Sequence, residues 1–333
     1  MFTEKRLFKL LPLLLLSLFF SGCTRKEPIH KSGFYFDTVI SITLYDPSKT
    51  AELEHCFTLA EQYENYFSTS IPDSDISQIN AAAPHSVPVH PETLELIQKG
   101  LSYAAVSKGK FDITIGKLAE LWDFESEAPK LPNAAAVAKA AAAVDYRKVS
   151  VNGNEVALTD PDAALDLGGI AKGYIADKMK EYLLSQGITS GLINLGGNVL
   201  TIGTKEDGSA YTIGIQKPFD ETGASVASVS IKDQTVVTSG VYERYFEQNG
   251  TRYHHILDTG TGYPYDNGLL SVSVICNNSA DGDGLSTSCF ALGLTKGMEL
   301  IESLEHTEAI FITSDGKLHC SSGIGTKIPF QQS

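Results

Sequence analysis

A glycine pair followed by a lysine and the start of an amphipathic helix lies near the middle of the chain, in the stretch DLGGIAKGYIAD (166–177). Glycines let a ligand approach bare backbone. Helix N-terminal amides and Lys172 both favour an anion such as phosphate. The stretch is not a Walker loop, because Lys172 precedes Gly173, and it lacks the GxGxxG pattern of dinucleotide sites. It predicts an anion-binding turn, the alternative being a tight strand-to-helix turn with an exposed lysine.

A second stretch, DGDGLSTSCFALG (281–293), combines a carboxylate and a hydroxyl at helical spacing. It is not an EF-hand calcium loop, because its twelfth position is Leu292 where a glutamate is required. Asp283 and Thr287 are four residues apart and so lie on one face of a helix. Such an oxygen pair suits Mg²⁺, which keeps open positions for phosphate oxygens.

Two adjacent histidines precede an aspartate and a Gly-Thr-Gly turn in YHHILDTGTGYP (253–264). Neighbours in a strand point to opposite faces, so only one of His254 and His255 would face a site. Histidine titrates near neutrality and is a natural general base. The other histidine is expected to be bonded to backbone. Asp258 is the reserve candidate for the base.

The elements that must position these residues follow from apolar periodicity and turn signals. Helices are predicted at 51–67, 91–107, 133–144 behind an Asn133 cap, 170–186, 285–292 and 295–304. Strands are predicted at 36–46, at 163–169, on both sides of a Gly-Gly-Asn turn in 191–203, at 211–216, 226–231, 234–238 and 270–276, and as a closing hairpin in 309–320. Strands mostly follow one another instead of alternating with helices, which favours the α+β class.

The composition and net charge of the chain disfavour some classes of binding partner. The chain has 333 residues, 42% of them hydrophobic, which suits one large domain or two small ones. The net charge of −14 argues against nucleic acid as a partner, since phosphate backbones require a basic surface. A small polyphosphate ligand remains compatible, because local amides and a metal can hold it.

The N-terminus has the order of an export signal. Three basic residues are followed by the apolar run 10–20, which is too short to span a bilayer, and then by Ser-Gly-Cys. The ending resembles the lipobox of bacterial lipoproteins, the alternative being an ordinary signal. We expect a signal peptide over 1–22, a lipidated Cys23 with a tether over 23–32, and one domain over 33–333. The protein would then be exported and lipid-anchored to the membrane, facing the periplasm or extracytoplasmic side.

The remaining cysteines are Cys56, Cys276, Cys289 and Cys320. No CxxC pair occurs, which argues against a zinc site. Export permits disulfides, whereas the apolar surroundings of three of the four are typical of buried free thiols. The sequence leaves both states open.

Taken together, these stretches resemble the ApbE family of flavin transferases, which move FMN from FAD onto a threonine or serine of another protein. The matches run in order along nearly the whole mature chain: Phe36-Asp37-Thr38, SDISQIN (74–80), GKFDITIG (109–116), ELWDF (120–124), DLGGIAKGYIAD (166–177), LINLGGN (192–198), TSGVYERYF (238–246), HHILDTGTGYP (254–264) and DGLSTS (283–288). The resemblance implies a single α+β domain of two lobes with FAD bound between them.

The resemblance also implies residue roles. Asp283 and Thr287 match the side-chain ligands of Mg²⁺, and Gly169 matches a ligand through its backbone. His255 matches the family's signature histidine, which makes it the candidate base over His254. The positions that match FAD-lining residues are Phe36, Lys110, Phe111, Asp112, Asp166, Lys172 and Ile256. Departures from the family pattern are Phe36 for methionine, Asp37 for glycine, Ser70 for an aromatic residue and Thr259 for proline.

The function implied is Mg²⁺-dependent transfer of FMN from FAD to a threonine or serine hydroxyl of an exported subunit of a membrane redox complex, with release of AMP. One alternative is an FAD pyrophosphatase that makes FMN and AMP with water as the nucleophile. The other is a flavin-binding lipoprotein without turnover. The Asp283/Thr287 pair disfavours the latter, since binding alone would not need a metal.

Overall fold

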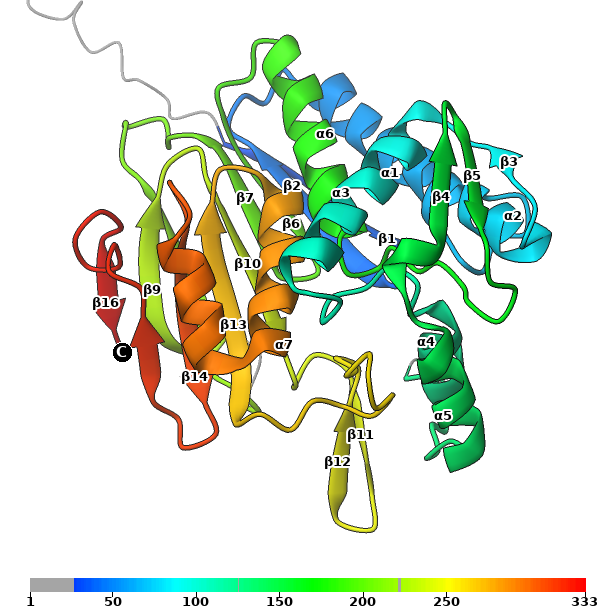
Figure 1. The fold of residues 1–333 in the computed structure, drawn as a ribbon. Coiled ribbons are helices and arrows are strands. Elements are labelled where there is room, and N and C mark those ends of the chain that lie inside the picture. Colours follow the sequence, from blue (N-terminus) through cyan, green and yellow to red (C-terminus); the bar gives the residue numbers. More distant parts are fainter. Residues whose placement is uncertain (1–26, 125, 221–222) are drawn as a thin grey trace, which may run out of the picture.

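The computed structural model describes residues 27–124, 126–220 and 223–333. The expected signal peptide and Cys23 lie outside the described residues. The centre of the fold is an eight-stranded antiparallel sheet in the order β1-β2-β6-β7-β10-β13-β14-β15 (Figure 1). Its strands are β1 (Ile29–Tyr35), β2 (Thr38–Leu44), β6 (Ser190–Leu195), β7 (Asn198–Gly203), β10 (Thr235–Gly240), β13 (Leu269–Cys276), β14 (Glu308–Thr313) and β15 (Leu318–Cys320).

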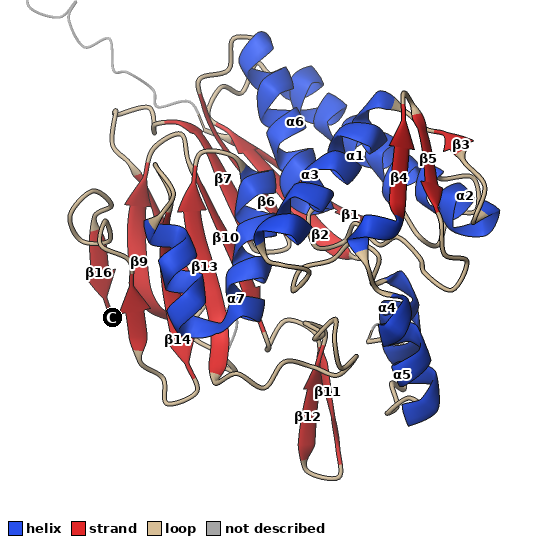
Figure 2. Ribbon diagram, viewed as in Figure 1, coloured by secondary structure: helices blue, strands red, loops and turns tan. Residues whose placement is uncertain are grey.

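Helices cover one face of this sheet and a smaller sheet covers part of the other (Figure 2). The helices are α1 (Thr50–Phe67), α3 (Pro91–Val106), α6 (Ala171–Ser185) and α7 (Ser279–Glu302). The smaller sheet has the order β16-β9-β8, made of β16 (Phe330–Gln332), β9 (Ser225–Ile231) and β8 (Tyr211–Gln216). Each layer has its own apolar cluster, so the central sheet is buried on both faces over β7, β10, β13 and β14.

Smaller elements extend from this body. The helix α2 (Asp75–Ala82) lies beside a sheet of β3 (Val87–Pro88), β5 (Glu155–Leu158) and β4 (Val149–Asn152). The helices α4 (Gly116–Trp122) and α5 (Ala134–Ala143) project at the same end as the hairpin of β11 (Tyr245–Gln248) and β12 (Thr251–His254) (Figure 1). A separate apolar cluster joins these last elements around Trp122, whose indole Nε1–H donates to the Gly262 carbonyl at 2.8 Å.

Several local predictions are confirmed, and the structure shows the contacts and backbone angles responsible. The buried side chains of α1 include Leu53, Phe57 and Ala60, at the spacing that predicted the helix. The Asn133 side chain caps α5 by accepting from the amides of residues 135 and 136. Gly196 and Gly197 both have positive φ at the turn between β6 and β7. The α+β class is confirmed.

The N-terminal boundary needs correction. The strand predicted at 36–46 is present as β2 (Thr38–Leu44) but begins later, because Phe36 and Asp37 both have positive φ (52° and 55°) and form the turn that joins β1 to β2. β1 begins at Ile29, so residues 29–32 belong to the sheet and not to the tether. The tether prediction shortens to residues 23–28.

Two other elements differ from the prediction. Residues 163–169 form no strand, but only an isolated bridge between Ile115 and Ala164, because a turn begins directly after Asp166. The two helices predicted near the C-terminus are present as the two parts of α7, which is broken at Gly293 (φ 78°) between them, but the first part begins earlier than predicted, at Ser279. The early start matters, since it places Asp283 in the second turn of the helix.

Cys56, Cys276 and Cys289 are buried free thiols and Cys320 is an exposed one, which resolves the question left open by the sequence. No helix in the part of the chain that the structure describes has the length and apolarity to cross a bilayer.

Candidate active site

The starts of α6 and α7 cap each other. The Gly173 amide, in the first turn of α6, donates to Asp283 Oδ2 at 2.6 Å. In return, Asp177 of α6 accepts from the amides of Ser279 and Ala280 at 2.7 and 2.9 Å. Each helix thus supplies a carboxylate for the free N–H groups of the other. A Cβ on Gly173 would lie 2.2 Å from the Ser279 carbonyl oxygen, so only glycine permits this approach.

Asp283 is the buried centre of this junction, with 5% of its surface exposed. Its Oδ1 accepts from the Asn198 side-chain amide at 2.6 Å. Burial raises the pKa of Asp283, while the charge of Lys172 and the two hydrogen bonds act against that shift. Each carboxylate oxygen retains lone-pair capacity for a cation.

Thr287 lies one turn further along α7 on the same face. Its hydroxyl is 3.0 Å from the Ser239 hydroxyl, which is itself 2.8 Å from that of Ser286. Ser239 belongs to β10, so this strand positions the Thr287 hydroxyl through a hydrogen bond. The predicted i,i+4 pair of Asp283 and Thr287 is therefore present on one helix.

The donor set fits a hard cation. A carboxylate (Asp283), a hydroxyl (Thr287) and a backbone carbonyl (Gly169) offer only oxygen, which Mg²⁺ prefers, and too few protein ligands to exclude water or phosphate. Among the described residues, no group of three histidine, cysteine, aspartate or glutamate side chains could hold a metal. The donors present thus do not suit a closed zinc site.

The glycine turn precedes α6 and lies exposed. Asp166 Oδ1 accepts from the Gly168 amide at 2.7 Å, which stabilises the turn. Lys172 Nζ is 3.5 Å from the Gly168 carbonyl, so its charge lies at the helix start. A Cβ on Gly169 would lie 3.1 Å from the Phe111 ring, which shows that the Phe111 side chain adjoins the turn. The predicted residues of 109–112 and 166–172 are thus brought together through this contact.

Asp112 has internal partners. Its carboxylate accepts from the Thr114 amide and hydroxyl and from the Tyr146 amide at 2.7–2.9 Å. It is 6% exposed, and burial raises its pKa. In this structure the carboxylate stabilises the turn after Phe111, and a contact with FAD stays a prediction.

The two histidines have different environments. His254, the last residue of β12, is buried and uses both ring nitrogens on backbone: Nε2 at 3.0 Å from the Tyr265 carbonyl and Nδ1 accepting from the Ile256 amide. His255 follows the strand, and its Nδ1 lies 3.3 Å from the Arg244 carbonyl. A carbonyl only accepts, so Nδ1 bears the proton and Nε2 presents its lone pair. Both histidines are thus bonded to backbone, but His254 uses both ring nitrogens in this way, whereas His255 uses only Nδ1.

Burial and, to a smaller extent, positive surroundings keep His255 neutral. Burial, followed by the charge of Arg244, lowers the pKa of His255 from 6.5 to about 3. Lys172 contributes in the same direction. The imidazole is therefore uncharged at neutral pH, and it is a weak base in this ligand-free state.

The reserve candidate, Asp258, forms an ion pair. Its Oδ1 lies 3.3 Å from Lys110 Nζ and accepts from the Gly260 amide at 2.8 Å. The Tyr265 hydroxyl donates to the Lys110 carbonyl at 3.2 Å. Thr259, at the position of the family's proline, donates from its hydroxyl to the Gly109 carbonyl at 2.7 Å. This hydroxyl ties the histidine segment to the loop that holds the predicted FAD residues.

The two other predicted FAD positions differ in exposure. Ile256 is 5% exposed, and its carbonyl accepts from the Tyr265 amide. Phe36 lies in the β1–β2 turn, and its amide donates to Glu64 Oε1 at 2.6 Å. A phenylalanine with positive φ is strained, which is common at ligand sites.

Comparison with known proteins decides the family. The family model described as ApbE matches residues 36–311. The FAD:protein FMN transferase of Klebsiella pneumoniae (strain 342) is 41% identical over 87% of this chain and 91% of its own length. That of Treponema pallidum (strain Nichols) is 32% identical over 92% of this chain and 90% of its own length. The chain belongs to the ApbE family.

Solved structures agree with this assignment. The ApbE protein of Thermotoga maritima superposes with a TM-score of 0.83 at 28% identity, over 89% of this chain and 97% of that one. The flavin transferase ApbE of Vibrio cholerae gives 0.80 at 28% identity, over the same shares. The prediction of a transferase of this family, with its mixed helix and sheet fold, is confirmed.

Three residues of this ApbE site were missed as individual positions. Asn198 and Ser239 lie in stretches that match the family, LINLGGN and TSGVYERYF, but nothing in their spacing marks them as partners of Asp283 and Thr287. Asp177 closes the matched stretch 166–177, yet its contact is 102 positions away in the sequence. Only the tertiary structure shows these pairs.

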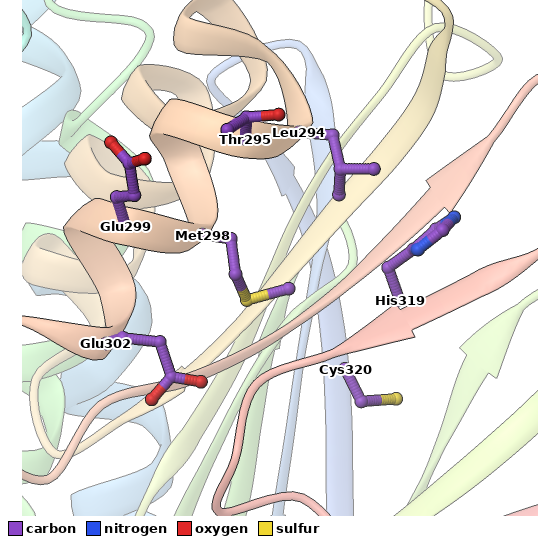
Figure 3. Close-up of a pocket in the computed structure, with 7 residues that line it drawn as sticks. All are labelled: Leu294, Thr295, Met298, Glu299, Glu302, His319 and Cys320. Carbon is purple, nitrogen blue, oxygen red and sulfur yellow. The ribbon is translucent and has the colours of Figure 1, made fainter.

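Two openings lie on the described surface. One of about 460 Å³ is lined by Phe34, Asp37, Phe124, Glu243, Arg244 and Tyr245, and thus adjoins His255 through Arg244. The other, of about 560 Å³, lies between α7 and β15, where the Met298 side chain extends toward His319 and Cys320 (Figure 3). None of the predicted site residues lines this second opening.

Proposed function

We propose that this chain transfers FMN from FAD to a threonine or serine hydroxyl of an exported protein, with Mg²⁺ bound and AMP released. The observation that carries the proposal is the buried Asp283, held by Gly173 and Asn198 at the start of α6. A buried carboxylate beside a helix N-terminus and Lys172 is a built site for a cation and a phosphate group.

The chain's own residues supply most of the chemistry. Asp283, Thr287 and the Gly169 carbonyl would hold Mg²⁺, which when bound neutralises charge on the two phosphates of FAD. Lys172 and the α6 amides add positive potential at the same place. The acceptor hydroxyl attacks the phosphorus on the FMN side, the bond from that phosphorus to the AMP oxygen breaks, and His255 Nε2 takes the hydroxyl proton.

The low pKa of His255 fits a site prepared for an anion. Burial lowers it most, and the charges of Arg244 and Lys172 lower it further. A bound diphosphate carries negative charge that offsets these two cations, so the basicity of His255 rises when FAD is present. The base would thus become effective when the substrate is in place.

The remaining expectations are proposals of the same kind. Cys23 would carry the lipid, and the protein would be exported and face acceptors at the same membrane, whose effective concentration the anchor would raise. The test is that Cys23→Ala no longer incorporates labelled fatty acid, whereas equal labelling of variant and parent contradicts lipidation.

The direct test uses the full chain, FAD, Mg²⁺ and an exported flavoprotein subunit from the same organism. We expect the mass of the subunit to rise by one FMN unit, with a bond that survives denaturation. His255→Ala should lower the rate about 10²–10⁴-fold with FAD affinity retained, whereas His254→Ala should act on stability. If free FMN and AMP accumulate at equal rates while the subunit stays unmodified, the pyrophosphatase alternative replaces transfer.

A further inference from the structure

Two large apolar side chains lie exposed next to each other near the active site. Phe34 on β1 is 67% exposed and Val39 on β2 is 57% exposed, the highest values among large apolar side chains in the described ranges. The register pairs Phe34 directly with Val39. Directly paired residues share one face of the sheet, with Cβ atoms about 5 Å apart. The two therefore form one apolar patch.

The patch continues into the opening beside His255. Phe34 lines the opening of about 460 Å³ together with Tyr245 and Arg244. The Arg244 carbonyl accepts from the backbone amide of His255 at 3.1 Å and lies 3.3 Å from its ring. One arginine thus joins the opening to the proposed base.

Further aromatic rings extend the surface beyond the opening. Tyr245 is 41% exposed and packs edge-on against Phe219, which is 40% exposed, with ring centroids 5.8 Å apart. The Arg252 guanidinium lies 3.8 Å above the Phe219 ring. Aromatic residues and arginine are the types enriched at the cores of protein interfaces. The surface therefore has the composition of a docking site.

We propose that this surface, defined by Phe34, Val39, Tyr245 and Phe219, docks the acceptor protein and presents its hydroxyl to His255. The inference rests on the proposed function. Transfer requires a macromolecular hydroxyl to reach His255, and the opening adjoins that residue through Arg244, so an acceptor that enters by this route would touch its walls. A segment with an apolar side chain next to the modified hydroxyl fits an apolar rim that surrounds a polar opening.

The other occupants fit the observations less well. The tether would enter at Ile29, at the start of β1, and Phe34 lies five residues further on, about 17 Å along the strand. A bilayer at the anchor is thus nearest to the end of β1 that lacks the patch. The opening is lined by Asp37 and Glu243 as well as by Arg244, so its side chains offer no net positive charge to the phosphates of FAD.

The test compares Phe34→Ser and Val39→Ser with Leu304→Ser, a matched change at an exposed apolar residue (38% exposed) after α7. The rate of FMN incorporation into the exported flavoprotein subunit is measured against subunit concentration. The full chain is kept in detergent micelles with saturating FAD and Mg²⁺. We expect the KM for the subunit to rise at least about 10-fold in both patch variants, with kcat and the KM for FAD unchanged. Phe34→Trp should retain the parent KM, and so should Leu304→Ser.

Each contrary outcome has a separate meaning. If the parent transfers no FMN, the proposed function fails and the docking proposal fails with it. If the parent transfers FMN and the patch variants keep its subunit KM in detergent, the docking proposal is overturned while the function stands, including the case where a difference appears only on vesicles. If the KM for FAD rises instead, the patch holds the flavin and the proposal is overturned.

Discussion

The starts of α6 and α7 are built alike and differ in charge. Each is capped by a carboxylate from the other helix, the buried Asp283 for α6 and the partly buried Asp177 for α7. The first turn of α7 carries Asp281, the sign that stabilises a helix N-terminus, and Asp281 is paired with Lys99 at 2.5 Å. The first turn of α6 carries Lys172 and no acidic residue. The charge at the start of α7 thus stabilises that helix, whereas the cation at the start of α6 destabilises the helix and attracts an anion.

The surroundings of the two carboxylates differ in the same way. Asp177 faces only the amides of α7, with the Lys99–Asp281–Tyr103 group beside it. Asp283 has an exposed glycine turn and the Thr287 hydroxyl on its own side of the junction. We therefore propose a structural role for Asp177 and a metal-binding role for Asp283, although both side chains cap a helix.

Substitution of the two carboxylates should give the largest effect on turnover and should distinguish these roles. Asp283→Asn should lower AMP release by about 10³-fold, because a neutral amide cannot replace the anionic ligand of Mg²⁺. Asp177→Asn, the matched control, should keep turnover within about 3-fold at a temperature where it is folded. The measurement is AMP release with saturating FAD and Mg²⁺. Equal losses in the two variants would show that both carboxylates act only as caps.

Gly173 is the point where the two helices meet, so its substitution should damage both. Gly173→Ala would place Cβ 2.2 Å from the Ser279 carbonyl oxygen, and the helices would have to separate. We expect a loss of about 3 kcal/mol in the free energy of unfolding, measured by urea denaturation. Gly187→Ala cannot serve as the control, because Gly187 has a φ of 79°. Ser185→Ala, at the exposed end of α6, should change stability by less than about 1 kcal/mol.

The pH dependence of stability tests the environment of the partly buried Asp177. Burial raises its pKa from 3.8 to about 6. Between these values the folded state binds a proton that the unfolded state does not, so this contribution to stability is complete below pH 3.8 and is lost as the pH rises through 6. The parent should therefore lose about 2 kcal/mol relative to Asp177→Asn between about pH 4 and about pH 7.5. A constant difference across urea denaturations in this range would contradict the raised pKa of Asp177.

Substitution of Lys172 should have the smallest effect on stability. It should stabilise the fold slightly while weakening the binding of FAD. Lys172→Gln removes a cation from the positive end of α6, so the free energy of unfolding should increase by about 0.3 kcal/mol. The same change should raise the KM for FAD about 10-fold, because the phosphates lose an attractive charge. Thermal melts and FAD titrations of one preparation measure both. A variant that is less stable and binds FAD as the parent does would reverse the interpretation of the α6 start.

Local features of the site could be predicted from the sequence, because their signals lie close together in the chain. The start of α6 follows from a glycine pair and apolar periodicity, and Asp283 and Thr287 share a face because they are four residues apart. The alternation of strand residues indicated that one histidine would be bonded to backbone, and His254 uses both ring nitrogens in this way.

Pairings between distant segments could not be predicted in this way. Gly173 and Asp283 are 110 positions apart, and no local preference marks a glycine amide as the partner of a particular carboxylate. The turn at Phe36 and Asp37 was missed for another reason. Apart from a single aspartate, the stretch lacks the Asn-Gly or Gly-Gly residues that usually signal two positive φ angles. The strain at Phe36 is visible only once the hairpin is formed.

The central claim is that Asp283 holds a divalent cation at the junction of α6 and α7. It is tested most directly by titrating the full chain with Mn²⁺ in place of Mg²⁺, in the presence of FAD, and following free Mn²⁺ by electron paramagnetic resonance. The parent and Asp177→Asn should each bind Mn²⁺ with similar affinity, and Asp283→Asn should bind it at least about 10-fold more weakly. Parent-like Mn²⁺ binding by Asp283→Asn would contradict the account.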